Sequence, residues 1–370
     1  MAGATDASGE LMGFSGCLQS RRFKIACLFL GFFATLLACG SFETFAHSGG
    51  SQLHYNQAVI DSLDREIAQC SDERYLAVLR GLRWCVAFCD DDSKFDFTFS
   101  NYIVMLDELT LYRTRPALAG IVHTLIVREF ERALPRFPTI FSTDADGYDD
   151  FISILPIAYH HQVPAKALKE FASHHFGAVT PIDRLHEFRQ AAKKRDYDRL
   201  TDLVVWAAFL NMAYRWQVDR DFTLPPDNYL TIMTECASIP FAVRFNQDTY
   251  HDQNYYATHV LLALNHYGQH PLLASVTADK VFFYLAGNYN TVRYRAGDFD
   301  LLCEYLYCFR QFAPEGVQFI SEGELYVLSQ QREDGSWGTS EDFEGDPYDQ
   351  LHPTWTAITL LIQGGPADSP

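Results

Sequence analysis

Positive charge is scarce in this 370-residue chain, which has 29 Lys and Arg residues against 47 Asp and Glu residues. The formal net charge is −18, and the basic residues form no stripe along the sequence. A strongly acidic surface repels the phosphates of nucleic acids and of anionic membranes. We therefore expect no nucleic-acid partner.

The sequence also lacks the motifs of several enzyme classes. It contains no GxSxG, HExxH or P-loop pattern, and these are the local signatures of α/β-hydrolases, zinc proteases and P-loop nucleotidases. Strand-type alternation of apolar and polar residues is scarce as well. What remains is a chain with 48% hydrophobic residues, including 29 Phe and 20 Tyr, which is enough to bury a large core.

A long apolar run is absent except near the N-terminus. The run Ile25 to Ala38 follows Arg21, Arg22 and Lys24. It is shorter than the about 20 apolar residues that cross a bilayer, so it is more typical of the apolar core of an export signal. The run leads into Leu-Leu-Ala-Cys-Gly, which resembles a bacterial lipobox with Cys39 as the lipidated residue.

These features predict the organisation of the N-terminal part. We expect a signal peptide with lipobox over residues 1–39, a small polar tether over residues 40–52, and a single domain over residues 53–370. The protein would then be exported and anchored by lipid at Cys39 to the periplasmic face of a bacterial cell envelope, so that the membrane is a partner. The alternative is a secreted soluble protein that is cleaved near Ala46.

Export bears on the cysteines, because an oxidising compartment permits disulfide bonds. No pair has CxxC spacing, and buried thiols on helices are an equally good interpretation. The residues concerned are Cys70, Cys85, Cys89, Cys236, Cys303 and Cys308.

Helical periodicity runs through nearly the whole chain beyond the tether. Pro116 to Leu134 has apolar residues at i, i+3, i+4, i+7 and i+8 from Leu118, and Leu200 to Trp216 has a similar stripe. Pro116 suits the first turn of a helix. The fold class predicted from these patterns is all-α.

A faint internal repeat supports a regular arrangement of helices. DTYHDQNYYATHVLLAL, from Asp248, aligns without a gap with DPYDQLHPTWTAITLLI, from Asp346, so that the offset is 98 residues. A pair of antiparallel helices with its turns takes roughly 45–50 residues. The offset therefore fits two helix pairs, and the chain after the tether has room for about six.

The string QQREDGSWG, from Gln330 to Gly338, resembles the QW motif of the squalene-hopene cyclase and prenyltransferase superfamily. The motif residues are Gln330, Gly335, Trp337 and Gly338. A Gln at a helix end can bond a neighbouring backbone while the Trp packs over it, and glycines allow a close approach. The resemblance implies an α/α toroid, a terpenoid-cyclase-like double ring of about six helical hairpins.

The string DPYDQLHPTWTAITLL is similar to a region of protein prenyltransferase β subunits, in which an Asp lies three residues before a zinc-binding His. That likeness places His352 in a metal site with Asp300 and Cys303, and zinc is the one cofactor that it suggests. In the family the other two ligands are two residues apart, whereas Asp300 and Cys303 are three apart. The DxDD acid of class II cyclases has no match in this chain.

Helix N-termini converge on one rim of such toroids, which gathers polar side chains there. The resemblance therefore implies that Asp300, Glu304, Asp349, His352 and His259 lie near the mouth of the central cavity. Among them, Asp349, His352 and His259 are the candidate catalytic acids or bases. The alternative is that His259 is a partly buried core histidine whose hydrogen bonds are made within the protein.

Two histidine pairs, His160-His161 and His174-His175, raise the question of a transition-metal site. They lie in separate segments, and no carboxylate stands at ligand spacing from either pair in the sequence. We therefore expect no metal at these histidines.

Two functions remain open. The first is an enzyme or binding protein whose central cavity takes a hydrophobic small molecule, a lipid- or isoprenoid-like ligand at the cell envelope. The second is a non-catalytic lipoprotein that scaffolds an envelope complex or binds a peptide or glycan. A deep aromatic pocket would favour the first, and a shallow acidic groove the second.

Overall fold

The computed structural model describes residues 55–110, 115–176, 181–217, 223–241, 244–245, 249–268, 276–312 and 318–363. All of them belong to one compact unit, Leu53–Pro370. The predicted signal peptide over residues 1–39, the lipidated Cys39 and the tether over residues 40–52 lie outside the described residues. Within those ranges no helix combines the length and the apolar character that a membrane crossing requires.

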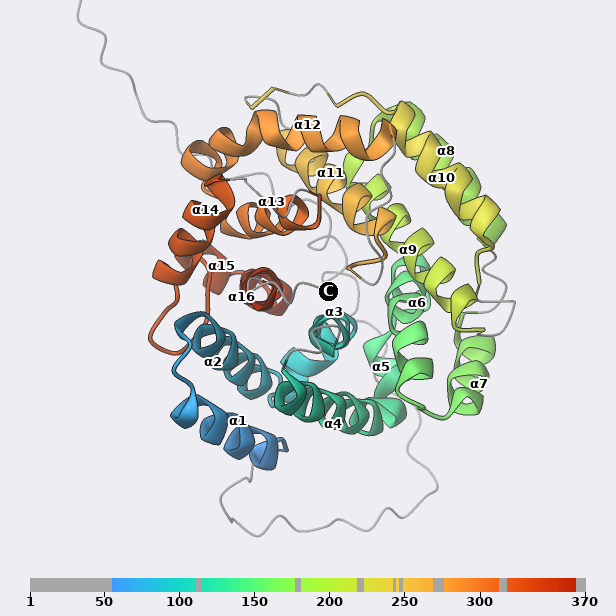
Figure 1. Cartoon of the computed structure of the whole chain (residues 1–370). Helices are drawn as coiled ribbons and strands as arrows, with labels where there is room; N and C mark the ends of the chain where they lie inside the picture. The colour runs from blue at the N-terminus through green and yellow to red at the C-terminus, as the bar shows by residue number, and fades with distance from the viewer. Residues whose placement is uncertain are drawn as a thin grey trace, which may run out of the picture. The chain divides into compact units, whose positions relative to one another are not determined.

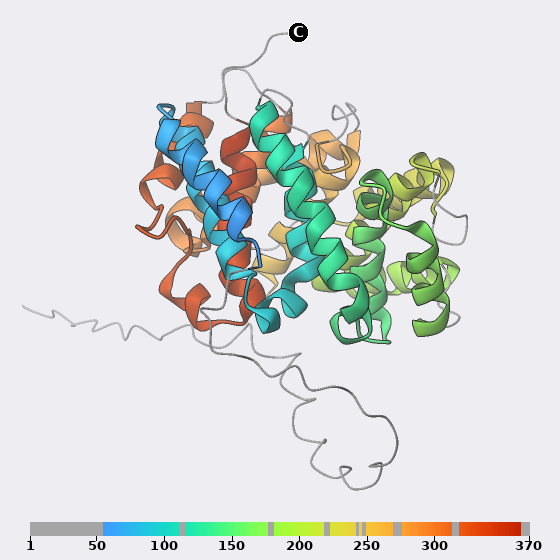
Figure 2. The ribbon, with the colours of Figure 1, turned by 90° about the horizontal axis from the view of Figure 1, so that it is seen from below.

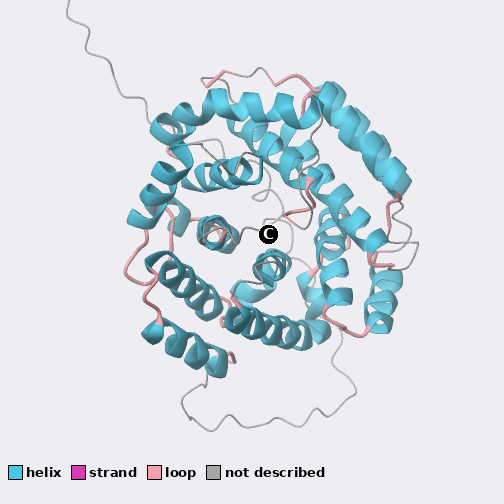
Figure 3. Ribbon diagram, in the orientation of Figure 1, coloured by secondary structure: helices cyan, strands magenta, loops and turns pink. Residues whose placement is uncertain are grey.

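All regular structure in the described part of the chain is helical, which confirms the all-α class (Figure 3). The α-helices are α1 (Gln57–Gln69), α2 (Glu73–Phe88), α3 (Asp92–Thr110), α4 (Pro116–Ala133), α5 (Phe137–Ile140), α6 (Ala145–His160), α7 (Ala165–His175), α8 (Pro181–Lys194), α9 (Tyr197–Arg215), α10 (Pro226–Ser238), α11 (Tyr250–Leu264), α12 (Val276–Thr291), α13 (Phe299–Phe312), α14 (Gln318–Ser329), α15 (Ser340–Glu344) and α16 (Pro347–Ile362). A short 3₁₀ turn, Leu134–Arg136, precedes α5, and a π-helical turn, Val292–Ala296, follows α12.

Six of these helices pack in a closed order, and we call them the ring helices. Helix α3 packs against α6, α6 against α9, α9 against α11, α11 against α13, α13 against α16, and α16 against α3. The chain alternates between these helices and others that cover them from outside, such as α4 on α3, α12 on α11 and α14 on α13 (Figure 1). On the outer side, α1 and α4 run side by side (Figure 2).

The predicted helical stripes coincide with buried faces. In α4 the side chains of Leu118, Val122, Leu125 and Ile126 are buried. The helix predicted from Leu200 starts earlier, at Tyr197, because the Asp196 side chain accepts a hydrogen bond from the Arg199 N–H and caps it. The two aligned repeat strings fall on α11 and α16, which lie on either side of α13 in the ring.

The segment that contains Trp337 connects α14 and α16 with α2. The Trp337 side chain is fully buried, and its Nε1–H donates to the Val327 carbonyl of α14 at 2.7 Å. Its backbone N–H donates to Thr354 Oγ1 of α16 at 2.9 Å. Its ring lies against Gly81 of α2, where a Cβ would come within 2.6 Å of the Trp337 ring. The tryptophan thus packs among α2, α14 and α16, which are far apart in sequence.

The glutamine that makes the neighbouring contact is Gln331 rather than the predicted Gln330. The Gln331 side-chain amide donates to the carbonyls of Ala77 in α2 and of Gly335, both at 2.9 Å. The Gln330 side chain is exposed, and its amide donates to the hydroxyl of the neighbouring Ser329 at 3.1 Å. Gly335 has φ +97° and lies so close to the Arg80 carbonyl that a Cβ would approach it to 2.6 Å.

The described cysteines make no disulfide bond within the ranges above. Cys70, Cys85, Cys89, Cys236, Cys303 and Cys308 all carry free thiols. All except Cys70 are buried. The interpretation as buried thiols therefore accounts for these six residues.

Candidate functional site

An aspartate and a histidine pair at the N-terminal ends of two adjacent ring helices. Asp300 is the second residue of α13, and its Oδ2 lies 2.7 Å from Nδ1 of His352 in α16. Tyr348 stacks on the imidazole of His352 at 4.6 Å between centroids, and Trp355 meets it edge-on at 4.9 Å. Tyr348 and Trp355 stand four residues before and three after His352, so one face of α16 holds the imidazole toward Asp300.

A tyrosine from the third helix completes this end of the site. The Tyr255 hydroxyl of α11 lies 3.0 Å from Asp300 Oδ2 and 3.1 Å from each carboxylate oxygen of Asp298. Asp298 also accepts from the Leu301 N–H at 2.9 Å, and so caps the first turn of α13. These bonds tie α11, α13 and α16 together where the partial positive charge of helix N-termini stabilises carboxylates.

Glu304 lies one turn further along α13 from Asp300 and contacts the Thr258 hydroxyl of α11. The Thr258 hydroxyl donates this bond to Glu304 Oε2, and its oxygen also lies 2.8 Å from the Tyr255 carbonyl. Burial, with 5% of Glu304 exposed, raises the pKa of this carboxyl well above its usual value.

Asp300 is shifted in the opposite direction. Burial by itself raises the pKa of a carboxyl group, but the charge and the hydrogen bond of His352 outweigh burial and bring the pKa of Asp300 below its usual value. The pKa values of two carboxyl groups one helical turn apart are thus shifted in opposite directions. Such a pair provides a proton donor and a proton acceptor within one site.

The structure brings together some of the predicted residues and separates others. Asp300, Glu304 and His352 offer ligand atoms that all lie within 4.8 Å of one another. Cys303 is not part of this set, because its thiol lies toward Thr356 in α16 while Glu304 takes the position toward α11. Burial also raises the pKa of the Cys303 thiol well above its usual value, which disfavours the thiolate that binds zinc. Any metal at this place would meet two carboxylates and one imidazole.

His259 lies beside Glu304, whereas Asp349 lies away from these groups in an exposed position. The Nδ1–H of His259 donates to the Tyr255 carbonyl at 2.9 Å, and the same nitrogen lies 3.7 Å from Glu304. Burial lowers the pKa of His259 to about 4, so the ring is neutral at pH 7. Asp349 is exposed, and its carboxylate accepts from the Asp346 N–H in the capping box of α16.

The sequence interpretation missed a buried acid that contacts α16. Glu108 of α3 accepts hydrogen bonds at Oε2 from Trp355 Nε1 at 3.0 Å and from Thr359 Oγ1 at 3.1 Å, both in α16. Burial raises its pKa to about 7. A signal was present, since Asp107 and Glu108 interrupt the otherwise apolar stretch YIVMLDEL.

Comparison with models of known protein families, with curated proteins and with solved structures gives no match.

Glu108 is expected to make the protein less stable as pH rises. The folded protein holds the proton of Glu108 up to about pH 7, whereas an unfolded glutamate releases it near pH 4.5. The unfolded state therefore binds fewer protons across this window, and the free energy of unfolding falls as pH increases. At about 1.4 kcal/mol per pH unit, the loss is about 3 kcal/mol.

The variant Glu108→Gln removes this loss, because a glutamine oxygen accepts both hydrogen bonds without charge. We expect it to exceed the wild type in stability by about 3 kcal/mol at pH 8 and to match it at pH 5, as measured by urea unfolding. Glu131→Gln, at an exposed position of α4, serves as the control. Equal effects of Glu108→Gln at both pH values would contradict a protonated Glu108.

Proposed function

We propose that the ring helices are the inner ring of an α/α toroid and that its centre is an acid–base site for a lipid- or isoprenoid-like ligand. The closed packing order of α3, α6, α9, α11, α13 and α16, with other helices covering them, supports the toroid. The single observation that carries the function is the buried pair Asp300 and Glu304, with opposite shifts of pKa. The acid in this arrangement is Glu304, and the base is Asp300 with His352.

The surroundings of the pair favour an apolar ligand without phosphate. The imidazole of His352 is flanked by Tyr348 and Trp355. Among the described residues, no lysine or arginine makes a hydrogen bond or an ion pair with Asp300, Glu304 or His352. Aromatic rings and a carboxylate stabilise a developing cation, whereas a phosphate group would need positive partners.

The proposed location agrees with such a ligand. A lipid anchor at Cys39 would hold the protein at the envelope membrane, from which an apolar molecule reaches the site without crossing water. Under this proposal Glu304 gives its proton to the ligand, and Asp300 takes a proton from the ligand. A proton then passes from Asp300 back to Glu304, which returns the site to its starting state. The scaffold function predicts no bound lipid at all.

The test is the lipid content of the full-length chain, extracted from its own membranes in detergent. We expect one apolar molecule for each wild-type chain in native mass spectrometry. Glu304→Gln keeps the size of the side chain and its contact with Thr258, but an amide has no acidic proton to give to the ligand. We expect this variant to carry an unprocessed lipid, which gas chromatography–mass spectrometry of the extract distinguishes from the wild-type lipid.

Glu341→Gln, at an exposed position of α15, is the matched control and should carry the wild-type lipid. Identical lipids in the wild type and Glu304→Gln would show binding without acid–base chemistry. A wild-type chain free of lipid would contradict the proposal and favour the scaffold function.

A further inference from the structure

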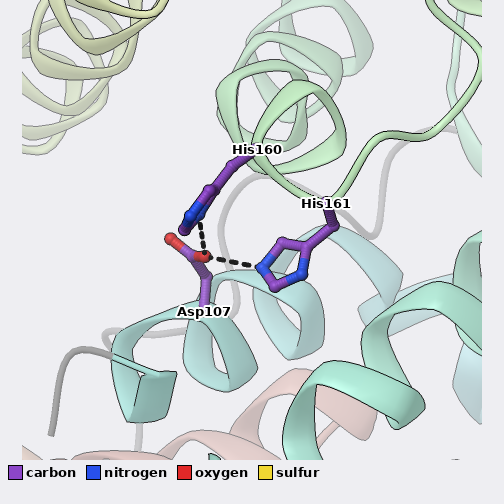
Figure 4. Close-up of side chains that lie close together, drawn as sticks. All are labelled: Asp107, His160 and His161. Carbon is purple, nitrogen blue, oxygen red and sulfur yellow. Dashed lines mark hydrogen bonds and ion pairs between the residues drawn. The ribbon is translucent and has the colours of Figure 1, made fainter. Parts of the chain in front are cut away.

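A second cluster of titratable side chains lies at the C-terminal ends of α3 and α6. Asp107 is near the end of α3, and His160 and His161 end α6 (Figure 4). One carboxylate oxygen of Asp107, Oδ1, lies 3.1 Å from Nε2 of His161 and 3.6 Å from Nδ1 of His160. The carboxylate that the sequence interpretation did not find beside this histidine pair thus comes from another helix.

The backbone at the end of α6 fixes the two imidazoles. Gln162 adopts φ +58°, the left-handed conformation that favours glycine. Its N–H donates to the Tyr159 carbonyl, and the Val163 N–H donates to the Ala158 carbonyl at 2.9 Å. These two bonds form the Schellman arrangement that ends a helix in a single defined geometry. His160 and His161 therefore leave the helix in fixed directions toward Asp107.

The cluster is buried on one side and open on the other. The side chains of Asp107 and His161 are 9% and 4% exposed, whereas that of His160 is 40% exposed. Trp216, at the end of α9, stacks on the His160 ring at 4.5 Å between centroids and is itself partly exposed. Solvent therefore reaches the cluster past His160 and Trp216.

The distances fit a shared metal ion. Bonds of about 2.0–2.1 Å in a tetrahedral zinc site place neighbouring ligand atoms about 3.3–3.4 Å apart. The two separations from Asp107 Oδ1, 3.1 and 3.6 Å, bracket that value. The ligand atoms of Asp107, His160 and His161 all lie within 4.8 Å of one another.

His123 of α4 supplies the partner that metal-binding imidazoles require. Its Nδ1 lies 2.8 Å from Nδ1 of His161, on the side of the ring away from Asp107. With a metal on Nε2, the Nδ1–H of His161 donates to His123, which fixes the tautomer and the ring orientation of His161. Both nitrogens of this buried imidazole then have a role.

We propose that Asp107, His160 and His161 bind one divalent transition-metal ion, with His123 as the hydrogen-bond partner of His161. Two imidazoles and one carboxylate suit Zn²⁺ or Fe²⁺ and do not suit Mg²⁺. The remaining coordination position faces solvent beside Trp216 and is free for water or a ligand group. The site is separate from the Asp300–His352 pair, which lies at the N-terminal ends of α13 and α16.

The test is calorimetric titration of the purified, chelator-treated full-length chain with Zn²⁺ at pH 7.5, with Mg²⁺ as the comparison ion. We expect one Zn²⁺ for each chain and no binding of Mg²⁺. His160→Gln, at a half-exposed position, should fold normally and weaken Zn²⁺ binding at least about tenfold. Binding should also weaken as pH falls toward 5, because protons compete for the imidazoles.

His174→Gln, an exposed histidine of α7, is the control and should bind Zn²⁺ like the wild type. Asp107→Asn provides a second variant with the same expected loss, and circular dichroism checks the folding of each. Anaerobic titration with Fe²⁺ decides which of the two ions binds more tightly. A wild type that takes up no Zn²⁺, or equal binding by the wild type and His160→Gln, would overturn the site.

Discussion

His352→Ala is expected to lower the free energy of unfolding by about 3–5 kcal/mol, the loss that is typical when one partner of a buried ion pair is removed. Asp300 and His352 are only 9% and 8% exposed and lie 2.7 Å apart. Without the imidazole, the Asp300 carboxylate stays buried and loses its contact at 2.7 Å, and the Tyr255 hydroxyl beside it is shared with Asp298. Urea unfolding at pH 7 measures the loss.

A second substitution separates the charge effect from the lost packing of His352. Asp300→Asn removes the buried charge, so the double variant His352→Ala/Asp300→Asn should be more stable than His352→Ala alone. This non-additivity is the mark of direct coupling between the two side chains. A loss below about 1 kcal/mol in His352→Ala, the range of an exposed ion pair, would contradict the buried pair.

Trp337→Ala is expected to cost about 3–5 kcal/mol, the range for truncation of a large buried aromatic side chain. Trp337 is fully buried and hydrogen-bonds α14 and α16, and its ring contacts Gly81 of α2. The substitution therefore opens a cavity among α2, α14 and α16. Thermal and urea unfolding of the full-length chain provide the measurement.

Gly81→Ala is the matched variant on the opposite side of this contact. Its new Cβ would come within 2.6 Å of the Trp337 ring, so we expect overpacking to cost about 1–3 kcal/mol in the wild type. In the Trp337→Ala background the same methyl group enters the cavity and should cost much less. Equal costs in both backgrounds would show that Trp337 and Gly81 do not share the space.

The helices were predictable because their signals are local. The stripe from Pro116 matches α4 almost to its end, since burial of one face and the proline at the first turn both lie within the segment. The start of α9 was placed too late, although Asp196 carried the capping signal. The aligned strings fall on α11 and α16, which pack on either side of α13.

The site was only partly predictable, because packing decides which neighbouring residue makes a contact. Successive residues on a helix point about 100° apart, so the sequence did not show that Glu304 rather than Cys303 joins Asp300 and His352. Gln330 and Gln331 pose the same difficulty at the Trp337 segment. Asp107 meets His161 across 54 residues of sequence, a distance over which no local pattern operates.

The protonation states of Asp300 and Glu304 at pH 7 test the proposed acid–base site most directly. Infrared difference spectra between the wild-type chain and single variants isolate the C=O stretch of a protonated carboxyl group. We expect Glu304→Gln to remove one such band and Asp300→Asn to remove none. If Glu304→Gln removed no band, both carboxyl groups would be ionised, and the pair could not serve as acid and base.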